Sequence, residues 1–234
     1  MRFAQIIHRS SPTLNAIYRH RFNRELITGE LASERFYFFL EQDYLYLRDF
    51  STALQQVSLR CEEESHQQVF SQLSLDILQT ERKLHLNYLK DRPNHSFFSA
   101  RREKIPAIAD YTAHLLCQTN TAPLREAIAG LIPCYFIYRE LGEQMNQSSQ
   151  ANPNNPYQAW LTSYSSKRFV GSTEKIIAIA EELNEQISCS RQQEAIYTAF
   201  HYSATCELRL LDEVYSLGEK IVKPSQKESS WSFH

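Results

Sequence analysis

The sequence is poor in residues that interrupt regular structure. It has 5 glycines and 8 prolines among 234 residues, and these two residue types are the strongest breakers of helices and strands. It has no run of about 18 consecutive apolar residues, which a membrane-spanning helix requires. Its first residues also hold no apolar stretch of signal-peptide length. We therefore predict long regular elements, no membrane span and no secretion signal.

The cysteines are few and follow no metal-binding pattern. Cys61, Cys117, Cys134, Cys189 and Cys206 form no C-x-x-C pair and no Cys/His pair at zinc spacing. Scattered cysteines in an odd number are typical of thiols in a reducing cytoplasm, so we predict a cytoplasmic protein. The formal net charge is −2, and both signs are mixed along the chain. A nucleic-acid partner usually requires a basic region, so we expect none here.

The hydrophobic pattern has the period of helices along the whole chain and shows no strand-like alternation. A break is expected near Ser10-Ser11-Pro12, inside the first helical stretch, and Ser33 is expected to cap the long helix that follows. The predicted helices cover residues 3–28, 33–61, 62–90, 107–118, 124–146, 157–164, 173–187 and 191–217. We predict one all-α domain of seven or eight helices over residues 1–222 and a polar, flexible tail at 223–234.

One acidic residue interrupts an apolar helical face. Asp43 lies in the middle of a stripe of apolar residues at helical spacing. A carboxylate that faces a core costs several kcal/mol unless it is paired or hydrogen-bonded. Asp43 is therefore either a structural acid with a dedicated partner or an acid that meets a flat, hydrogen-bonding ligand between aromatic rings. The stripe consists of Phe36, Phe39, Leu40, Tyr46, Leu47, Phe50 and Leu54.

Two further residues have side chains that can carry chemistry. Cys134 follows Pro133, a residue that removes a helical hydrogen bond. Cys134 is either a small core residue or a thiolate nucleophile, and the second role requires its pKa to be lowered from about 8.5. Glu207 lies on or beside the apolar face of the last helix and is, taken alone, a structural acid. With Asp43 and Cys134 it makes a set of two carboxylates and one thiol, and two acids in different environments can take different roles.

Five short blocks carry a resemblance to a known family. In this order and spacing, over about residues 14–215, they resemble the TenA (thiaminase II) family. The blocks are Gln42-Asp43-x-x-Tyr46-Leu47, Tyr111-Thr112, Leu131-x-Pro133-Cys134-Tyr135-x-x-Tyr138-x-Glu140-x-Gly142, Trp160-x-x-Tyr164, and Tyr202 to Glu207.

The resemblance implies a haem-oxygenase-like helical bundle, a homotetramer, and no metal or other cofactor. It also implies hydrolysis of 4-amino-5-aminomethyl-2-methylpyrimidine, and more slowly of thiamine, to the hydroxymethylpyrimidine used in thiamine salvage. Cys134 resembles the family's nucleophile, Asp43 the acid that hydrogen-bonds the pyrimidine, and Glu207 the proton shuttle. The phenols that the resemblance places around the substrate are Tyr46, Tyr111, Tyr138 and Tyr164.

The chain departs from the family pattern in two places. The family commonly has His-Pro-Phe where this chain has His20-Arg21-Phe22, and an aromatic pair where this chain has Leu210-Leu211. The second departure removes aromatic surface beside Glu207. It therefore bears on which pyrimidine is preferred.

Two alternatives stand beside the hydrolase. The same fold houses metal-dependent oxygenases, but a di-iron site requires two Glu-x-x-His motifs on different helices. This chain has one, Glu63-x-x-His66, in an acidic run typical of the first turn of a helix. The second alternative is a non-catalytic pyrimidine-binding or regulatory protein of the same fold. Such a protein would not need Cys134, and the sequence has no helix-turn-helix signal.

Overall fold

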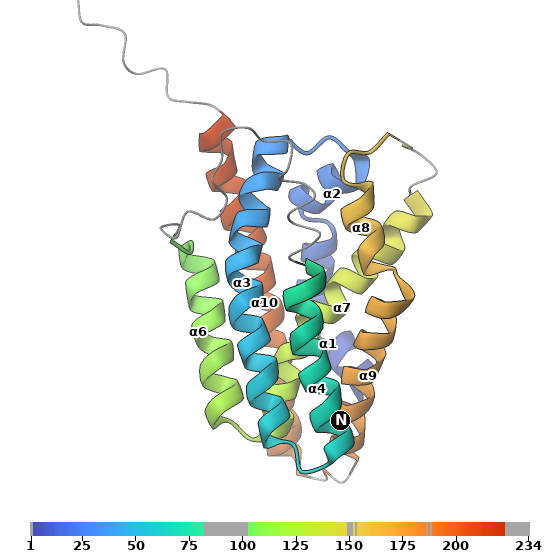
Figure 1. Cartoon of the computed structure of the whole chain (residues 1–234), viewed down its shortest axis with the longest axis vertical. Coiled ribbons are helices and arrows are strands. Elements are labelled where there is room, and N and C mark those ends of the chain that lie inside the picture. Colours follow the sequence, from blue (N-terminus) through green and yellow to red (C-terminus); the bar gives the residue numbers. More distant parts are fainter. Residues whose placement is uncertain are drawn as a thin grey trace, which may run out of the picture.

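The computed structural model describes residues 2–81, 103–148, 152, 154–185, 187 and 189–222. Over these residues the chain is helical and forms no β-strand, which confirms the predicted all-α fold (Figure 1). The elements are α1 (Phe3–Tyr18), α2 (Arg21–Thr28), α3 (Ser33–Arg60), α4 (Glu64–Asp76), the π-helix η1 (Ile77–Glu81), α6 (Pro106–Thr121), α7 (Leu124–Ser148), α8 (Gln158–Tyr164), α9 (Lys167–Asn184) and α10 (Ser190–Val222).

The long helices lie side by side along the long axis of the molecule (Figure 1). Helix α10 packs against α7, α1, α3 and α6, while α3 also packs against α4, α6 and α7. Four helices, α3, α6, α7 and α10, therefore contact one another around a common interior, where their side chains can meet. The largest fully buried side chains of the core are Trp160, Tyr111, Phe22, Phe36, Phe39, Phe50, Phe70 and Phe200.

The first helical stretch breaks at a different place from the one predicted. Helix α1 continues through Pro12, and the break falls at Arg19 and His20. The reason lies in local hydrogen bonding. The His20 Nδ1 atom accepts a hydrogen bond of 3.1 Å from the Phe22 amide and so caps α2. The Asn23 side chain also donates to the Ile17 carbonyl at 2.8 Å, which satisfies a group at the end of α1.

Other helix boundaries differ by smaller amounts. Ser33 is the first residue of α3 and not its cap; that position is Ala32, which makes no capping hydrogen bond with its side chain. Helix α9 begins at Lys167, six residues before the predicted start, because the Ser166 hydroxyl accepts a hydrogen bond from the Phe169 amide at 3.2 Å. In the predicted helix 62–90, residues 82–90 lie outside the described part of the chain, as does the predicted tail at 223–234.

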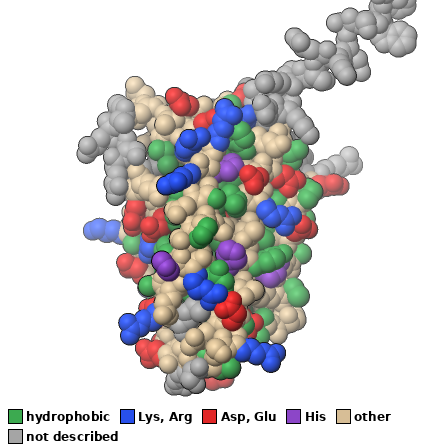
Figure 2. Space-filling model, turned by 180° about the vertical axis from the view of Figure 1, so that it is seen from behind, with side chains coloured by type: hydrophobic (Ala, Val, Ile, Leu, Met, Phe, Trp, Pro, Cys, Tyr) green, Lys and Arg blue, Asp and Glu red, His purple; other side chains and the backbone are tan. Residues whose placement is uncertain are grey.

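The surface carries charges of both signs. On the face shown in Figure 2, acidic and basic side chains are interspersed, with histidine and hydrophobic side chains between them. None of the described helices combines the length and the apolar character that crossing a bilayer demands.

Candidate active site

Helix α3 directs Asp43 into the bundle. Asp43 is 7% exposed, and Phe39 and Phe50, which lie about one turn and two turns away on the same helix, are fully buried. The burial predicted from the apolar stripe is therefore confirmed. The charge of Asp43 acts on Glu207 of α10, whose pKa it raises. The two acids, 164 positions apart in sequence, thus face the same interior.

Glu207 is held in a form that can donate a proton. It is 3% exposed, and its Oε1 atom accepts a hydrogen bond of 3.1 Å from the Tyr111 hydroxyl of α6. Burial raises the pKa of Glu207 to about 8, the negative charge of Asp43 adds to this rise, and the hydrogen bond from Tyr111 opposes it. At neutral pH the carboxyl group is therefore mostly protonated, as a general acid must be.

Tyr46 and Cys134 complete the cluster around Glu207. The ring of Tyr46 lies 5.0 Å from that of Tyr111. Burial raises the pKa of Tyr46 well above its ordinary value, and negative charge on Cys134, Tyr111 and Glu207 raises it further, so these groups lie close to its hydroxyl. Cys134, on α7, is 9% exposed and acts electrostatically on both tyrosines. The structure thus brings together Asp43 and these four residues from four helices.

The Tyr46 hydroxyl is a buried polar group. Among the described residues it makes no hydrogen bond of ordinary geometry, although the Tyr111 hydroxyl is near. A buried polar group that lacks a partner costs free energy, and such groups in native proteins often serve a function. The Tyr46 hydroxyl therefore has the capacity for a further hydrogen bond.

The other two predicted phenols form an adjoining cluster. Tyr138 lies one turn beyond Cys134 on α7, and its ring is 5.1 Å from that of Tyr164 on α8. Both rings pack on Trp160, at 6.0 Å and 4.8 Å. Trp160 in turn contacts Phe39 of α3 at 5.5 Å. This aromatic cluster therefore lies against the face of α3 that carries Phe39 and, one turn further on, Asp43. The sequence analysis does not assign Trp160 to the site.

Gly142 sets the distance between α7 and α8. A Cβ atom at this position would lie 2.9 Å from the Ser165 backbone nitrogen and 3.0 Å from the Cβ of Tyr164. Such distances are too short for ordinary side chains, so only glycine allows the two helices this approach. The close approach is what brings Tyr164 against Tyr138.

Cys206 is adjacent to Glu207 in the sequence. Its thiol is buried, and burial raises its pKa to about 12, with a further rise from the charge of Glu207. A thiol with such a pKa is not a nucleophile at neutral pH. All five cysteines lie in the described part of the chain, and none of them forms a disulfide.

The histidine of the Glu-x-x-His motif lies near a carboxylate of another helix. The His66 Nε2 atom lies 3.3 Å from Glu182 on α9, while Glu63 is the cap of α4. Among the described residues, no three His, Cys, Asp or Glu side chains lie together in a way that could hold a metal ion. The two replacements noted in the sequence, Leu210 and Leu211, are both buried on α10.

With this geometry established, comparison with known proteins gives the family. The sequence model described as the TENA/THI-4/PQQC family matches residues 8–216. The chain belongs to this family. The resemblance indicated by the sequence motifs is therefore confirmed.

The relatives of this TENA/THI-4/PQQC chain include an aminopyrimidine aminohydrolase and a multifunctional protein. It is 26% identical over 213 residues to an aminopyrimidine aminohydrolase of Halalkalibacterium halodurans, which covers 91% of this chain and 95% of that protein. It is 30% identical over 193 residues to the thiamine biosynthesis multifunctional protein ThiED of Corynebacterium efficiens, which covers 82% of this chain. The chain spans about a quarter of ThiED, 25% of its length.

Solved structures agree on the fold. A TenA homologue from P. horikoshii OT3 superposes with a TM-score of 0.82 over 91% of this chain and 97% of that chain, at 21% identity. A domain of unknown function from Shewanella denitrificans, described as having a heme oxygenase-like fold, superposes with a TM-score of 0.75 over 99% of both chains, at 11% identity. The predicted haem-oxygenase-like bundle is thus confirmed.

Proposed function

We propose that this protein is an aminopyrimidine aminohydrolase of thiamine salvage. Its substrate is 4-amino-5-aminomethyl-2-methylpyrimidine, and thiamine is a slower one; the product is 4-amino-5-hydroxymethyl-2-methylpyrimidine. The observation that carries the proposal is the buried pair of Tyr111 and Glu207 beside Cys134 and Asp43. The relatives named as aminopyrimidine aminohydrolases support the same reaction class.

In this mechanism Cys134 opens the reaction. Its sulfur adds to the ring carbon beside the one that bears the methylene group, and the thiol proton passes to the neighbouring ring nitrogen. Asp43 hydrogen-bonds the opposite edge of the ring, which is formed by the exocyclic amine and the other ring nitrogen, and this favours the positive charge that builds up on the amine. The electron pair of the exocyclic amine then expels the leaving amine from the methylene carbon.

Glu207 moves the protons at the other end of the breaking bond. Its protonated carboxyl group gives a proton to the departing amine, and the resulting carboxylate takes a proton from the water that adds to the methylene carbon. Departure of the Cys134 sulfur with the proton from the ring nitrogen restores the aromatic ring and the thiol. The reaction therefore consumes one water and releases one ammonia. The hydrogen bond from Tyr111 keeps Glu207 oriented through both transfers.

The test is a chromatographic assay that follows hydroxymethylpyrimidine from the aminomethyl compound and, separately, from thiamine. The wild type should form product faster from the aminomethyl compound. Cys134→Ser should abolish product while largely retaining pyrimidine binding in calorimetry. Full turnover in this variant would refute the nucleophile. Binding by the wild type without product from either compound would instead identify a non-catalytic pyrimidine-binding or regulatory protein.

We propose further that the protein is a cytoplasmic homotetramer without a cofactor. The absence of disulfides among five cysteines supports a reducing compartment. Light scattering should give four times the chain mass of 27.4 kDa. A clean monomer would contradict the tetramer, and activity lost on chelation and restored by iron would contradict the metal-free mechanism.

A further inference from the structure

Helix α6, which carries Tyr111, begins without a capping side chain of its own. Its cap position is Ile105, which supplies no side-chain hydrogen bond, and its first residue is Pro106, which has no N–H group. The backbone N–H groups at a helix start need acceptors from elsewhere. In this protein the acceptors are side chains of two other helices, α3 and α10.

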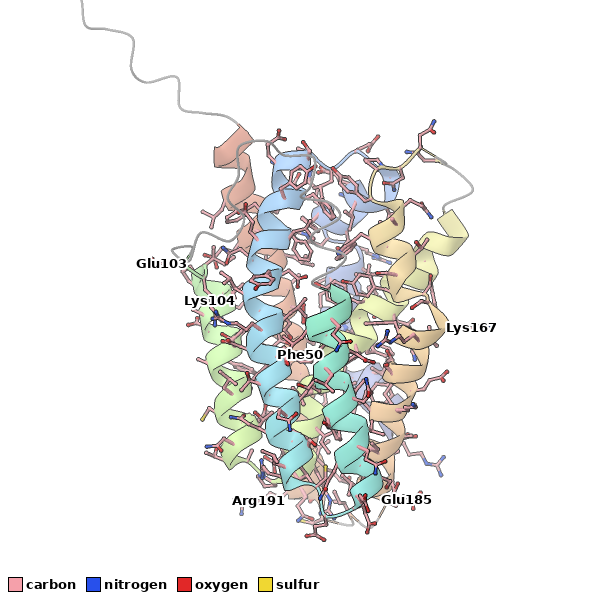
Figure 3. The ribbon with its side chains drawn as sticks, in the orientation of Figure 1. Phe50, Glu103, Lys104, Lys167, Glu185 and Arg191 are labelled. Atoms are coloured by element: carbon pink, nitrogen blue, oxygen red, sulfur yellow. The ribbon has the colours of Figure 1, made fainter. Side chains whose placement is uncertain are left out.

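The first anchor is Gln42, the neighbour of Asp43 on α3. Its Oε1 atom accepts a hydrogen bond of 2.9 Å from the Ile105 amide, and its Nε2 atom donates one of 3.3 Å to the Glu103 carbonyl. Gln42 is 3% exposed. One buried amide group thus binds the segment entering α6 at two points, on either side of Lys104. Figure 3 shows Glu103 and Lys104 at this end of α6, next to α3.

The second anchor is Glu213 on α10. Its Oε2 atom accepts a hydrogen bond of 2.7 Å from the Ala107 amide, in the first turn of α6. One turn further along α6, the Tyr111 hydroxyl donates to Glu207, also on α10. Two hydrogen bonds, one turn apart, therefore join α6 to α10. The one at Ala107 fixes the position from which the Tyr111 hydroxyl reaches Glu207. The Lys104 ammonium group adds a link between Asp49 of α3 and Thr112, the residue after Tyr111.

We propose that Gln42 and Glu213 are positioning residues: they fix the start of α6 so that the Tyr111 hydroxyl stays on Glu207. This inference rests on the proposed function for its meaning in catalysis. Its structural content, that two remote side chains control the environment of Glu207, is independent of turnover. Neither Gln42 nor Glu213 touches the reacting atoms in the mechanism.

The groups around Glu207 determine the direction in which its pKa should change when an anchor is lost. Asp43 of α3 and Tyr111 of α6 act on its pKa. Its own charge raises the pKa values of Tyr46 of α3 and Cys206 of α10, and Cys134 of α7 lies close to Tyr46 and Tyr111. Of these, only Tyr111 lowers the pKa of Glu207. Loss of an anchor should therefore raise the pKa of Glu207. If Glu213 acted instead through its own negative charge, its removal would lower that pKa, and entry of water into a loosened site would also lower it.

The experiment measures the pKa of Glu207 by ¹³C NMR of protein labelled at the glutamate carboxyl carbons, with Glu207→Gln to assign the signal. Gln42→Leu and Glu213→Leu each remove one anchor. Glu213→Gln keeps an acceptor for the Ala107 amide without the charge, so it should behave like the wild type. Asp110→Asn is the matched control, because it breaks the exposed Arg209–Asp110 pair, 3.2 Å, which also joins α6 to α10.

Both leucine variants should raise the pKa of Glu207 by about half a unit or more, in the same direction as Tyr111→Phe. In a Tyr111→Phe background they should add no further shift, because the hydrogen bond is already absent. The same variants should lower kcat several-fold and move the upper limb of the pH–rate profile to higher pH. Asp110→Asn should change neither quantity.

An unchanged or lowered pKa of Glu207 in either leucine variant would overturn the proposal. The same holds if the leucine variants still shift this pKa fully in the Tyr111→Phe background. It also holds if Glu213→Gln shifts the pKa as much as Glu213→Leu does. If the variants show the expected pKa shifts but the wild type makes no hydroxymethylpyrimidine, the positioning role is supported and the hydrolase is refuted. Normal hydrolysis without the shifts would refute only the positioning role. Circular dichroism confirms that each variant is folded.

Discussion

The Tyr111 hydroxyl donates a hydrogen bond to Glu207 across the interface of α6 and α10, at 3.1 Å and out of contact with solvent. This hydrogen bond opposes the other influences on the protonation of Glu207. Burial and the charge of Asp43 favour the protonated form, whereas the phenol stabilises the carboxylate. A group that must give and then take a proton benefits from such a balance, because neither form is strongly favoured near neutral pH.

Glu207→Gln should remove proton transfer while keeping the shape of the site. Glutamine retains an oxygen that accepts the hydrogen bond from Tyr111, so folding and pyrimidine binding should change little. Because general acid–base catalysis contributes about 10²–10⁴-fold, kcat should fall by about that factor. Steady-state kinetics with the aminomethylpyrimidine checks this. A kcat within threefold of the wild type would exclude Glu207 as the shuttle.

Stability should fall as pH rises, and Glu207 should be a main cause. The folded protein holds the Glu207 proton up to a pKa of about 8, whereas an unfolded glutamate releases it near the ordinary value of 4.5. The folded state therefore binds more protons between these limits, so the free energy of unfolding decreases through this window.

The measurement for that effect is urea unfolding of the wild type and of Glu207→Gln at pH 5 and pH 9. At pH 9 the glutamine variant should be more stable than the wild type by about 2–5 kcal/mol, on the scale of about 1.4 kcal/mol per pKa unit. At pH 5 the two should differ by much less. An equal difference at both pH values would show that the pKa of Glu207 is not raised.

The sequence was sufficient for the parts of the site that depend on local spacing. Asp43 and Glu207 were identified because each carboxylate lies among apolar residues at helical intervals, and both are buried as expected. The position of Cys134 near Tyr46 and Tyr111 agrees with the motif order, while the catalytic role of these residues stays a prediction.

Contacts between distant segments could not be predicted from the sequence. The bond from Tyr111 to Glu207 joins residues 96 positions apart, and the bond from Ala107 to Glu213 joins residues 106 apart. No periodicity encodes which helices become neighbours. The misplaced break in the first helix has a similar origin, because the cap at His20 depends on the rotamer of one histidine and not on a Gly or Pro signal.

Tyr46→Phe should lower activity without lowering the stability of the fold. The Tyr46 hydroxyl is buried without a hydrogen bond of ordinary geometry among the described residues, so its removal should leave the free energy of unfolding unchanged or raise it by about 1 kcal/mol. If the hydroxyl bonds the pyrimidine or the attacking water, kcat/KM should fall about tenfold, the equivalent of one neutral hydrogen bond.

Tyr157→Phe is the control for that variant. The Tyr157 hydroxyl is also buried but donates to the Leu31 carbonyl at 2.5 Å, so its loss should destabilise the fold by about 1 kcal/mol. Thermal unfolding and steady-state kinetics on the two variants should give opposite patterns. A destabilised Tyr46→Phe with wild-type kinetics would show that this phenol is structural.

Gly142→Ala should alter the aromatic wall of the site through the spacing of two helices. The added methyl group would lie 2.9 Å from the Ser165 backbone nitrogen and 3.0 Å from Tyr164, so α8 has to move away from α7. We expect a loss of about 1–3 kcal/mol in the free energy of unfolding, as for other overpacked positions. Because Tyr164 would retreat from Tyr138, KM for the pyrimidine should rise while kcat changes less.

Gly171→Ala provides the matched comparison, since it lies inside α9 and its added methyl group would meet no atom within 4 Å. Alanine is the better helix former there, so this variant should gain about 0.5–1 kcal/mol and keep its KM. Urea unfolding and kinetics on both variants test the two statements together. A Gly142→Ala protein with wild-type stability and KM would mean that the approach of α8 to α7 does not shape the pyrimidine site, and that Tyr138 and Tyr164 serve only the core.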